Sequence, residues 1–128
     1  MENLIKESHQ MAKDKGFWDE ERNRPEMLML IVSEVSEALE ALRRNYYCDP
    51  FKAIELYDNI KDRLDPGLKE NWKKQFETSI KSSFEDELAD VAIRLFDLCG
   101  GLNVDLEKHI KMKMKYNSLR PYKHGKKF

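Results

Sequence analysis

The amino-acid sequence predicts an all-α protein built as an antiparallel helical bundle. Charged residues make up 37% of the 128 residues, whereas only five glycines and four prolines occur. This composition disfavours a turn-rich β domain and favours long amphipathic helices. Apolar residues recur at helical spacing between capping signals, and no strand pattern or internal repeat interrupts them.

Each expected helix has a recognisable start or stop. Asn23 is the expected N-cap before Pro25, which belongs in a first turn, and Glu26 is placed to complete a capping box. Arg24 is the alternative cap, because a proline disfavours helical dihedrals at the residue before it. Ser83 and Asp86 form a second capping box, and Asn103 is the expected cap of the last helix. The expected helices span about 2–15, 25–44, 51–63, 68–80, 83–99 and 103–117, the fifth ending at Gly100-Gly101. The chain reads as one domain over 1–128, with a short helical insertion at about 45–82 and a tail at about 118–128.

The second expected helix has a long apolar face. Leucine, isoleucine and valine recur there three and four residues apart, at Leu28, Ile31, Val32, Val35, Leu39 and Leu42. Residues with this spacing share one face of a helix. We expect this face to be part of the protein core.

The charge of the chain is uneven. Its formal net charge is −1, but no acid follows Glu107, and seven Lys or Arg residues lie between Lys111 and the end. A basic tail can bind nucleic acid, neutralise an acidic body, hold a small polyanion beside a metal site, or simply be solvated. No nucleic-acid-binding motif occurs, and the acidic body would repel phosphates, so a nucleic-acid partner is the least favoured of these. No apolar run reaches the length of a membrane span.

Two pairs of carboxylates stand out because they interrupt apolar helical stretches. Glu34 and Glu37 lie in MLMLIVSEVSEALEAL, and Glu87 and Asp90 lie in FEDELADVAIRLF. Residues three apart share a helix face, so each pair points one way. Buried acids repel one another unless a cation lies between them, and Mg²⁺ prefers such oxygen ligands. The alternative is that all four are exposed helix charges paired with Arg or Lys.

Other chemistries lack their motifs. Neither a Glu-x-x-His pair, HExxH, a P-loop, GxGxxG nor GxSxG is present. The two cysteines, Cys48 and Cys99, form neither a CxxC pair nor a disulfide framework. The polar start MENLIKESHQ lacks the apolar segment of a signal peptide. We therefore expect a cytoplasmic protein with reduced thiols.

The sequence resembles the MazG-type all-α nucleoside triphosphate pyrophosphohydrolases, a superfamily that includes dimeric dUTPases and dCTP pyrophosphatases. Its ExxE and ExxD pairs, Glu34/Glu37 and Glu87/Asp90, match the family signature. The flanks KGFW, IVSEVSEALEALR, ELADVAIRLFDL and KYNSLRPYKHGKKF also match, in order. The resemblance covers most of the chain except about 45–82. It implies a four-helix-bundle-like fold, with the insertion between the second and third core helices.

The resemblance also implies an activity and the residues that carry it out. The reaction is Mg²⁺-dependent hydrolysis of a (deoxy)nucleoside triphosphate to the monophosphate and pyrophosphate, with Mn²⁺ as a possible substitute metal. Glu34, Glu37, Glu87 and Asp90 match the metal-binding acids, and Glu37 is our choice for the residue that orients the attacking water. A homodimer or homotetramer is implied as well.

Substrate-binding roles follow from the same resemblance. The matching positions are His9, Trp18, Lys113, Asn117, Arg120 and Lys126, with Lys123 and His124 nearby in the tail. Trp18 is equally well explained as a core aromatic residue, His9 as a surface helix residue, and the tail cations as solvated charges. Arg94 replaces an aromatic residue of the dCTP branch, so no base or sugar preference follows. The alternative function is a non-catalytic helical module that binds nucleotides or a partner.

Overall fold

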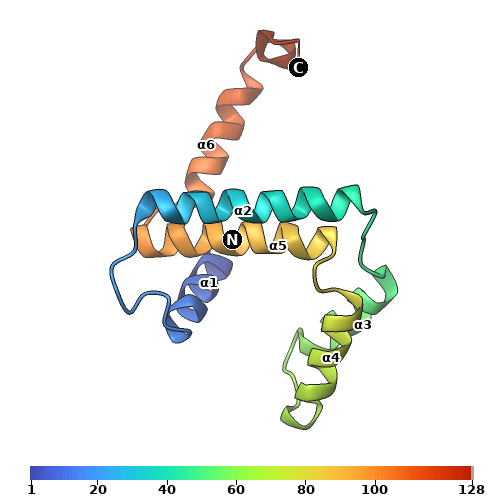
Figure 1. The fold of residues 1–128 in the computed structure, drawn as a ribbon. Helices are drawn as coiled ribbons and strands as arrows, with labels where there is room; N and C mark the ends of the chain where they lie inside the picture. Colours follow the sequence, from blue (N-terminus) through green and yellow to red (C-terminus); the bar gives the residue numbers. More distant parts are fainter. Residues whose placement is uncertain (128) are drawn as a thin grey trace. The chain divides into compact units, whose positions relative to one another are not determined.

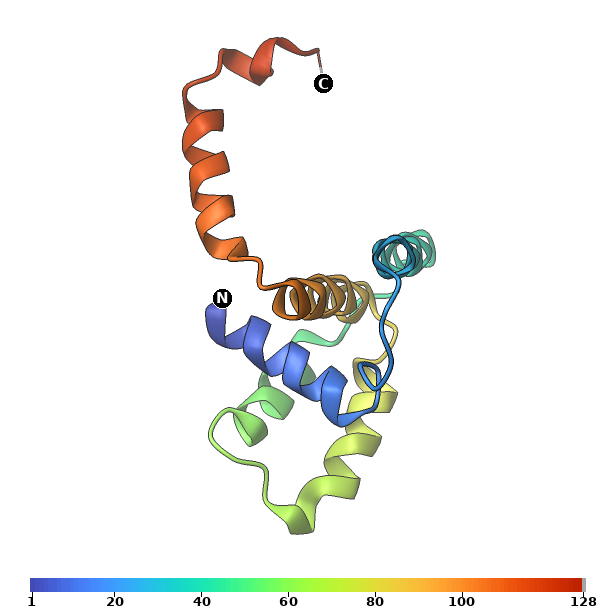
Figure 2. The same ribbon diagram turned by 90° about the vertical axis from the view of Figure 1, so that its left-hand side faces the viewer.

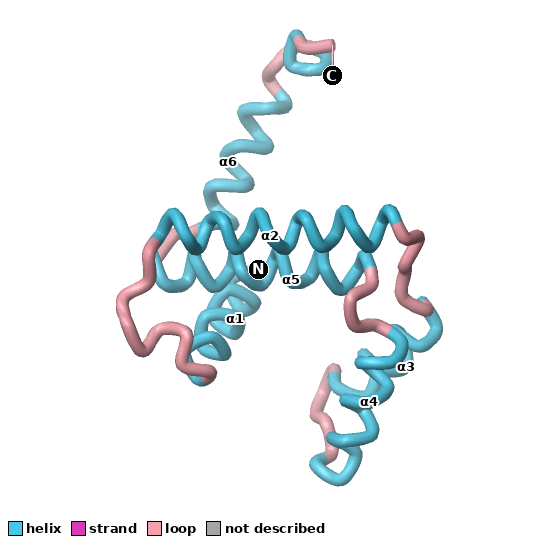
Figure 3. The backbone as a smooth tube through the Cα atoms, in the orientation of Figure 1, coloured by secondary structure: helices cyan, strands magenta, loops and turns pink. Residues whose placement is uncertain are grey.

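The computed structural model describes residues 1–127, and its regular elements in that range are all helices (Figures 1 and 3). The prediction of an all-α fold is therefore confirmed. The helices are α1 Glu2–Asp14, α2 Arg24–Arg43, α3 Pro50–Ile60, α4 Lys69–Ser79, α5 Phe84–Leu102 and α6 Leu106–Ser118. Short 3₁₀ turns form at Pro66–Leu68 and Tyr122–Gly125. Phe128, the last residue of the expected tail, lies outside the described residues.

The chain divides into two compact units. Unit 1 holds Met1–Glu21 and the chain from Leu95 onward, and unit 2 holds Arg22–Arg94. The boundary falls within α5, whose first part belongs to unit 2 and whose second part belongs to unit 1. The expectation of a single domain across the whole chain stays a prediction. None of the helices within residues 1–127 is long and apolar enough to cross a membrane.

In unit 2 the side chains of both predicted N-cap residues, Asn23 and Ser83, accept hydrogen bonds at the starts of their helices. The side-chain oxygen of Asn23 accepts a hydrogen bond from the Glu26 N–H at 3.0 Å, and α2 begins at the next residue. At the start of α5, Ser83 Oγ accepts from the Asp86 N–H at 3.2 Å, and the Asp86 carboxylate accepts from the Ser82 N–H at 2.8 Å. These bonds satisfy amide groups that have no partner inside a helix.

The predicted end of α5 is wrong. The helix continues through Gly100 and Gly101 to Leu102, and it ends where Asn103 adopts a left-handed φ of 55°. In unit 1 a Cβ atom at Gly100 would lie 2.6 Å from His9 Cβ, and one at Gly101 would overlap the Trp18 ring. The two glycines therefore permit close approach of α1 and the following loop instead of stopping the helix.

The predicted cap of the last helix is also wrong, by two residues. Asp105, not Asn103, accepts the capping hydrogen bond, from the Lys108 N–H at 3.1 Å. Asn103 is instead the residue that ends α5, because asparagine tolerates the left-handed conformation there.

The apolar face expected to form the core of α2 is exposed, which corrects the prediction. Five of its six members are 42–53% exposed, namely Leu28, Val32, Val35, Leu39 and Leu42. The residues of α2 that are buried are Met27, Ala38 and Ala41. Alanine has a low side-chain volume, which lets another helix approach closely, and the first part of α5 runs antiparallel beside α2 (Figures 1 and 2).

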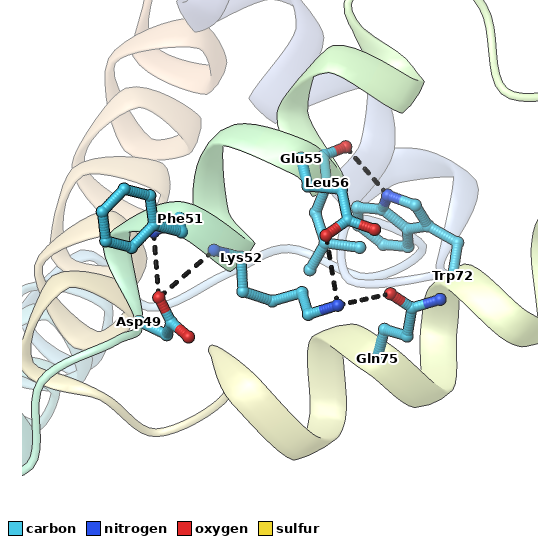
Figure 4. Close-up of polar contacts among 7 residues, drawn as sticks. All are labelled: Asp49, Phe51, Lys52, Glu55, Leu56, Trp72 and Gln75. Atoms are coloured by element: carbon cyan, nitrogen blue, oxygen red, sulfur yellow. Dashed lines mark hydrogen bonds and ion pairs between the residues drawn. The ribbon is translucent and has the colours of Figure 1, made fainter.

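Within unit 2 the insertion forms a helical hairpin of α3 and α4 (Figure 4). The Asp49 side chain caps α3 by accepting from the Phe51 N–H at 2.9 Å. Lys52 Nζ donates to Glu55 at 3.2 Å and to Gln75 at 3.1 Å, and Trp72 donates to the Leu56 carbonyl at 3.0 Å. Leu56 on α3 is only 3% exposed, so its side chain is buried within the insertion.

Hydrogen bonds close the two ends of the insertion against each other. The Phe84 N–H donates to the Tyr46 carbonyl at 2.9 Å, and the Tyr46 hydroxyl donates to the Lys81 carbonyl at 3.2 Å. The Cys48 N–H donates to Glu85 at 2.9 Å. We refer to these contacts as the neck of the insertion. The neck joins the end of α2 to the start of α5 and so helps to hold those helices side by side.

Candidate metal centre

Three carboxylates from α2 and α5 converge in unit 2. One oxygen from each of Glu34, Glu87 and Asp90 lies within 4.8 Å of the others. Glu87 and Asp90 share one face of α5 because they are three residues apart, and α2 brings Glu34 to that face. Three of the four acids that the sequence predicted as metal ligands therefore lie together.

The three acids are partly removed from water, which makes their charges costly. Glu87 is only 8% exposed, and the side chain of Glu34 is 14% exposed. Burial raises the pKa of Glu87 above its ordinary value, and the neighbouring charges of Asp90 and Glu34 raise it further. Burial also raises the pKa of Asp90, with Asp86 and Glu34 adding to the effect. A cation bound between these groups would relieve both the repulsion and the lost hydration.

Arg94 already supplies part of that positive charge. Its Nε donates to Glu34 Oε1 at 2.6 Å, a short charge-assisted hydrogen bond. The positive charge also lowers the pKa of Asp90, against the larger effect of burial. Arg94 lies on α5 one turn beyond Asp90, so it faces the same side of the helix. The sequence left open that the four acids pair with Arg or Lys, and in the structure Arg94 is paired with Glu34.

Glu37 lies one turn further along α2, outside the group of three converging acids. Its side chain is exposed, and its charge is the last and smallest of the neighbouring charges that raise the pKa of Glu87. Glu37 is therefore close enough to act on the cluster electrostatically while facing solvent. Its roles as a fourth ligand and as the residue that orients water stay predictions.

His9 and Trp18, predicted to bind a nucleobase, converge on Asp97 in unit 1. His9 Nδ1 donates to Asp97 Oδ1 at 2.9 Å, and Trp18 Nε1 donates to the same oxygen at 2.8 Å. The two rings meet edge to face with centroids 5.0 Å apart. Asp97 is 7% exposed, and these donors compensate its burial. The sequence signal for this buried acid is the position of Asp97 inside the apolar run LFDLC.

The remaining predicted substrate contacts lie in unit 1, on α6 and the tail. Lys113 Nζ lies 4.7 Å from the centre of the Tyr116 ring. The guanidinium carbon of Arg120 lies 5.7 Å from the centre of the same ring. Arg120 also donates to the His124 carbonyl at 3.4 Å. Asn117 Oδ1 is buried and accepts no hydrogen bond from residues 1–127, and Lys126 is exposed. The binding roles of these four residues stay predictions.

Unit 1 also contains a hollow of about 720 Å³ between α1, the end of α5 and α6. Its lysines are partly neutralised, because Lys6 pairs with Glu2 at 3.2 Å and Lys111 pairs with Glu107 at 3.1 Å. The mixed charge gives this hollow no preference for an anionic ligand. None of the six residues predicted to bind substrate lines it.

Comparisons with protein-family models, with curated proteins and with solved structures found no match for this chain. The resemblance to MazG-type enzymes therefore rests on the residues quoted above. The functional interpretation rests on those residues and on the geometry of the carboxylates.

Proposed function

We propose that the protein is a Mg²⁺-dependent nucleotide pyrophosphohydrolase with a MazG-like four-helix arrangement. It would convert a (deoxy)nucleoside triphosphate and water into the monophosphate and pyrophosphate. The observation that supports this proposal best is the convergence of Glu34, Glu87 and Asp90 within 4.8 Å, in a partly buried site. These acids come from the two sequence motifs that resemble the family signature.

The donor set fits Mg²⁺. All three converging groups offer carboxylate oxygens, the ligands that this hard cation prefers. Burial and, after it, repulsion between neighbouring acids raise the pKa of Glu87 and of Asp90, and a cation that relieves both effects has a favourable place to bind. When bound, Mg²⁺ supplies charge that offsets the negative phosphate oxygens of the substrate.

The chain's own groups have separate roles in this proposal. Glu34, Glu87 and Asp90 hold the cation, and exposed Glu37 orients the water that attacks phosphorus. In the metal-free protein Arg94 offsets part of the negative charge of the acids, because its Nε donates to Glu34 at 2.6 Å. His9, Trp18, Lys113, Asn117, Arg120 and Lys126 remain the proposed substrate contacts.

One observation favours the alternative function, a non-catalytic module that binds a nucleotide or a partner. The Arg94–Glu34 ion pair gives Glu34 a partner without any metal. In that case the acids and Arg94 would be a structural charge network across α2 and α5. The two functions differ in turnover and in the effect of neutralising Glu87.

The deciding experiment is product analysis. The purified protein is incubated with a panel of nucleoside and deoxynucleoside triphosphates, with Mg²⁺, with Mn²⁺ or with EDTA, and pyrophosphate is resolved from orthophosphate. Monophosphate plus pyrophosphate, formed only with metal, supports the proposal. Nucleotide binding without turnover supports the module instead, and orthophosphate plus diphosphate would show a different cleavage position.

Matched variants connect the activity to the site. Glu34→Gln and Glu87→Gln keep side-chain size and remove charge, and we expect each to lower kcat/KM at least about 100-fold. Glu77→Gln on α4 is the control, because this exposed acid lies outside the converging group. Circular dichroism of each variant separates loss of activity from loss of fold. Equal activity of all three variants would refute the assigned site.

We also propose that the protein is cytoplasmic and assembles at least as a homodimer. Both cysteines are free, as expected for a reducing compartment. Large apolar side chains on α2 are exposed, and exposed apolar surface of this kind marks interaction sites.

A further inference from the structure

Glu37 and Arg44 lie on one face of α2. They are seven residues apart, which is close to two full turns of a helix. Between them on this side of the helix is Ala41, a small residue that is only 5% exposed. Arg44 is exposed, and long side chains on a helix point back toward its N-terminus. The direction back along α2 from Arg44 leads over Ala41 to Glu37 and the three converging acids.

Arg44 has no carboxylate of its own. It forms no ion pair with another residue in the part of the chain that the structure describes. Glu40, one turn before it on α2, is paired with Arg43 instead, at 4.0 Å. Arg94, which lies beside the converging acids, is bonded to Glu34. The positive charge of Arg44 is therefore free to bind an anionic ligand.

A triphosphate bound at the carboxylates would need a further cation. The three converging carboxylates, Arg94 and one Mg²⁺ together carry no net charge. A terminal phosphate group adds about 1.5 to 2 negative charges near pH 7. The cations predicted to bind substrate, Lys113, Arg120 and Lys126, belong to unit 1, whereas Arg44 shares unit 2 with the carboxylates.

We propose that Arg44 binds the β- and γ-phosphates of the substrate, the part that leaves as pyrophosphate, and so makes the site select triphosphates over diphosphates. The inference rests on the proposed function, because it takes hydrolysis of a nucleoside triphosphate as its starting point. It adds the direction of the phosphate chain, which runs from the carboxylates along α2 toward the C-terminal end of that helix.

The distance along the helix suits a phosphate chain. Seven residues correspond to about 10 Å along the axis from the Glu37 Cα atom to the Arg44 Cα atom. Part of this length is covered by the arginine side chain, which is long and points the right way. The rest is left for the phosphates between the arginine and the acids, where the small side chain of Ala41 leaves room.

A guanidinium also suits the chemistry of the leaving group. Its planar fork of N–H donors binds two phosphate oxygens at once and stays charged at physiological pH. In the proposed reaction water attacks the α-phosphorus, and the bond from that phosphorus to the bridging oxygen breaks. The departing pyrophosphate keeps the bonding electron pair, so negative charge grows on it. A cation placed beside that charge stabilises the transition state.

Arg43 provides a matched control. Arg44 is the C-cap of α2, where a cation also interacts favourably with the last carbonyl groups of the helix. Arg43, the last residue of the helix, shares this benefit. Successive residues point about 100° apart around a helix, so Arg43 does not share the face of Glu37 and Arg44. The two arginines therefore separate a structural role at the helix end from a role in binding phosphate.

Calorimetric titration with inorganic pyrophosphate and Mg²⁺ tests the contact without turnover. We expect Arg44→Gln to raise the Kd for pyrophosphate at least about tenfold, because charge-assisted hydrogen bonds are lost, and Arg43→Gln to change it by less than about twofold. Arg44→Lys keeps the charge but not the fork, so its Kd is expected to lie between those of the wild type and Arg44→Gln. Equal Kd values for Arg44→Gln and Arg43→Gln would overturn the proposal.

Steady-state hydrolysis tests the selectivity. We compare kcat/KM for a nucleoside triphosphate with kcat/KM for the corresponding diphosphate. We expect Arg44→Gln to lower this ratio at least about tenfold, because only the triphosphate offers both distal phosphates to Arg44. An unchanged ratio would overturn the proposal, since a structural role affects both substrates alike. A wild type without any turnover would instead overturn the proposed function, and the pyrophosphate titration would still decide whether Arg44 binds phosphate.

Discussion

Replacing Glu87 by Gln is expected to stabilise the metal-free protein while it weakens Mg²⁺ binding. One carboxylate oxygen of Glu87 lies within 4.8 Å of one carboxylate oxygen of Glu34 and of one of Asp90. Glu87 itself is only 8% exposed, but Glu34 and Asp90 are partly exposed, so we take an effective dielectric constant of about 40, between the values for a buried pair and for water. At 4.8 Å each pair of charges then repels by about 1.7 kcal/mol.

The net gain is smaller than the sum of the two repulsions. Arg94 offsets part of the negative charge through its bond to Glu34. We expect Glu87→Gln to raise the free energy of unfolding by about 1–2 kcal/mol. For a chain of this size that corresponds to an increase in Tm of about 3–8 °C. Thermal unfolding followed by circular dichroism in EDTA measures this change.

Metal addition is expected to reverse the order of stability. Mg²⁺ raises the Tm of a protein whose folded state binds it, so the wild type gains and Glu87→Gln gains much less. Glu77→Gln, the control on α4, is expected to change stability by less than about 0.5 kcal/mol. A Tm of Glu87→Gln below that of the wild type in EDTA would refute the reasoning, because it would mean that the Glu87 charge is compensated by the folded protein.

Three further predictions follow from the same geometry. The Tm advantage of Glu87→Gln in EDTA is expected to shrink as pH falls through the raised pKa of Glu87 and to vanish below the ordinary value of 4.5. Between these two pKa values the folded wild type binds a proton at Glu87 that the unfolded chain does not, which stabilises the folded state. Melting curves from pH 4 to pH 8 check this, and a Tm difference that is independent of pH would contradict it. Arg94→Gln is expected to lower the metal-free Tm but to tighten Mg²⁺ binding by a few-fold, since Arg94 competes with a cation for Glu34, and calorimetric titration would show the reverse if Arg94 helps to hold the metal site. Gly101→Ala is expected to destabilise the protein by about 1–3 kcal/mol, because its Cβ would overlap Trp18, whereas Gly67→Ala, whose Cβ would come no closer than 3.4 Å to another atom, is the control in urea unfolding.

The helices were largely predictable because their signals are local. Asn23 with Glu26 and Ser83 with Asp86 satisfy amide groups a few residues away, so the sequence contains both partners. Gly100-Gly101 misled the prediction because the same residue type serves two purposes. Glycine ends helices, but it also permits close approach, and only the positions of His9 and Trp18 decide between these roles.

The carboxylate cluster was predictable in part. The three-residue spacing of Glu87 and Asp90 places them on one face of α5, and the apolar residues around them indicate that this face is partly buried. The pairing of α2 with α5 then brings Glu34 to the same face. The ion pair between Arg94 and Glu34 required the register between two helices, which no local pattern specifies. The prediction that the apolar face of α2 belongs to the core is wrong because periodicity shows that residues share a face without showing what covers it.

The neck of the insertion has a consequence for how the chain folds. About 40 residues separate α2 from α5, and closing so long a loop costs conformational entropy that grows with the logarithm of its length. The contacts between α3 and α4 are closer in sequence, so this hairpin can form first and shorten the effective loop to about ten residues. The saving is about 1.2 kcal/mol, or roughly eightfold in rate. Replacing residues 50–79 by a flexible linker of equal length is therefore expected to slow folding in stopped-flow experiments by that factor, even if the paired α2 and α5 are unchanged.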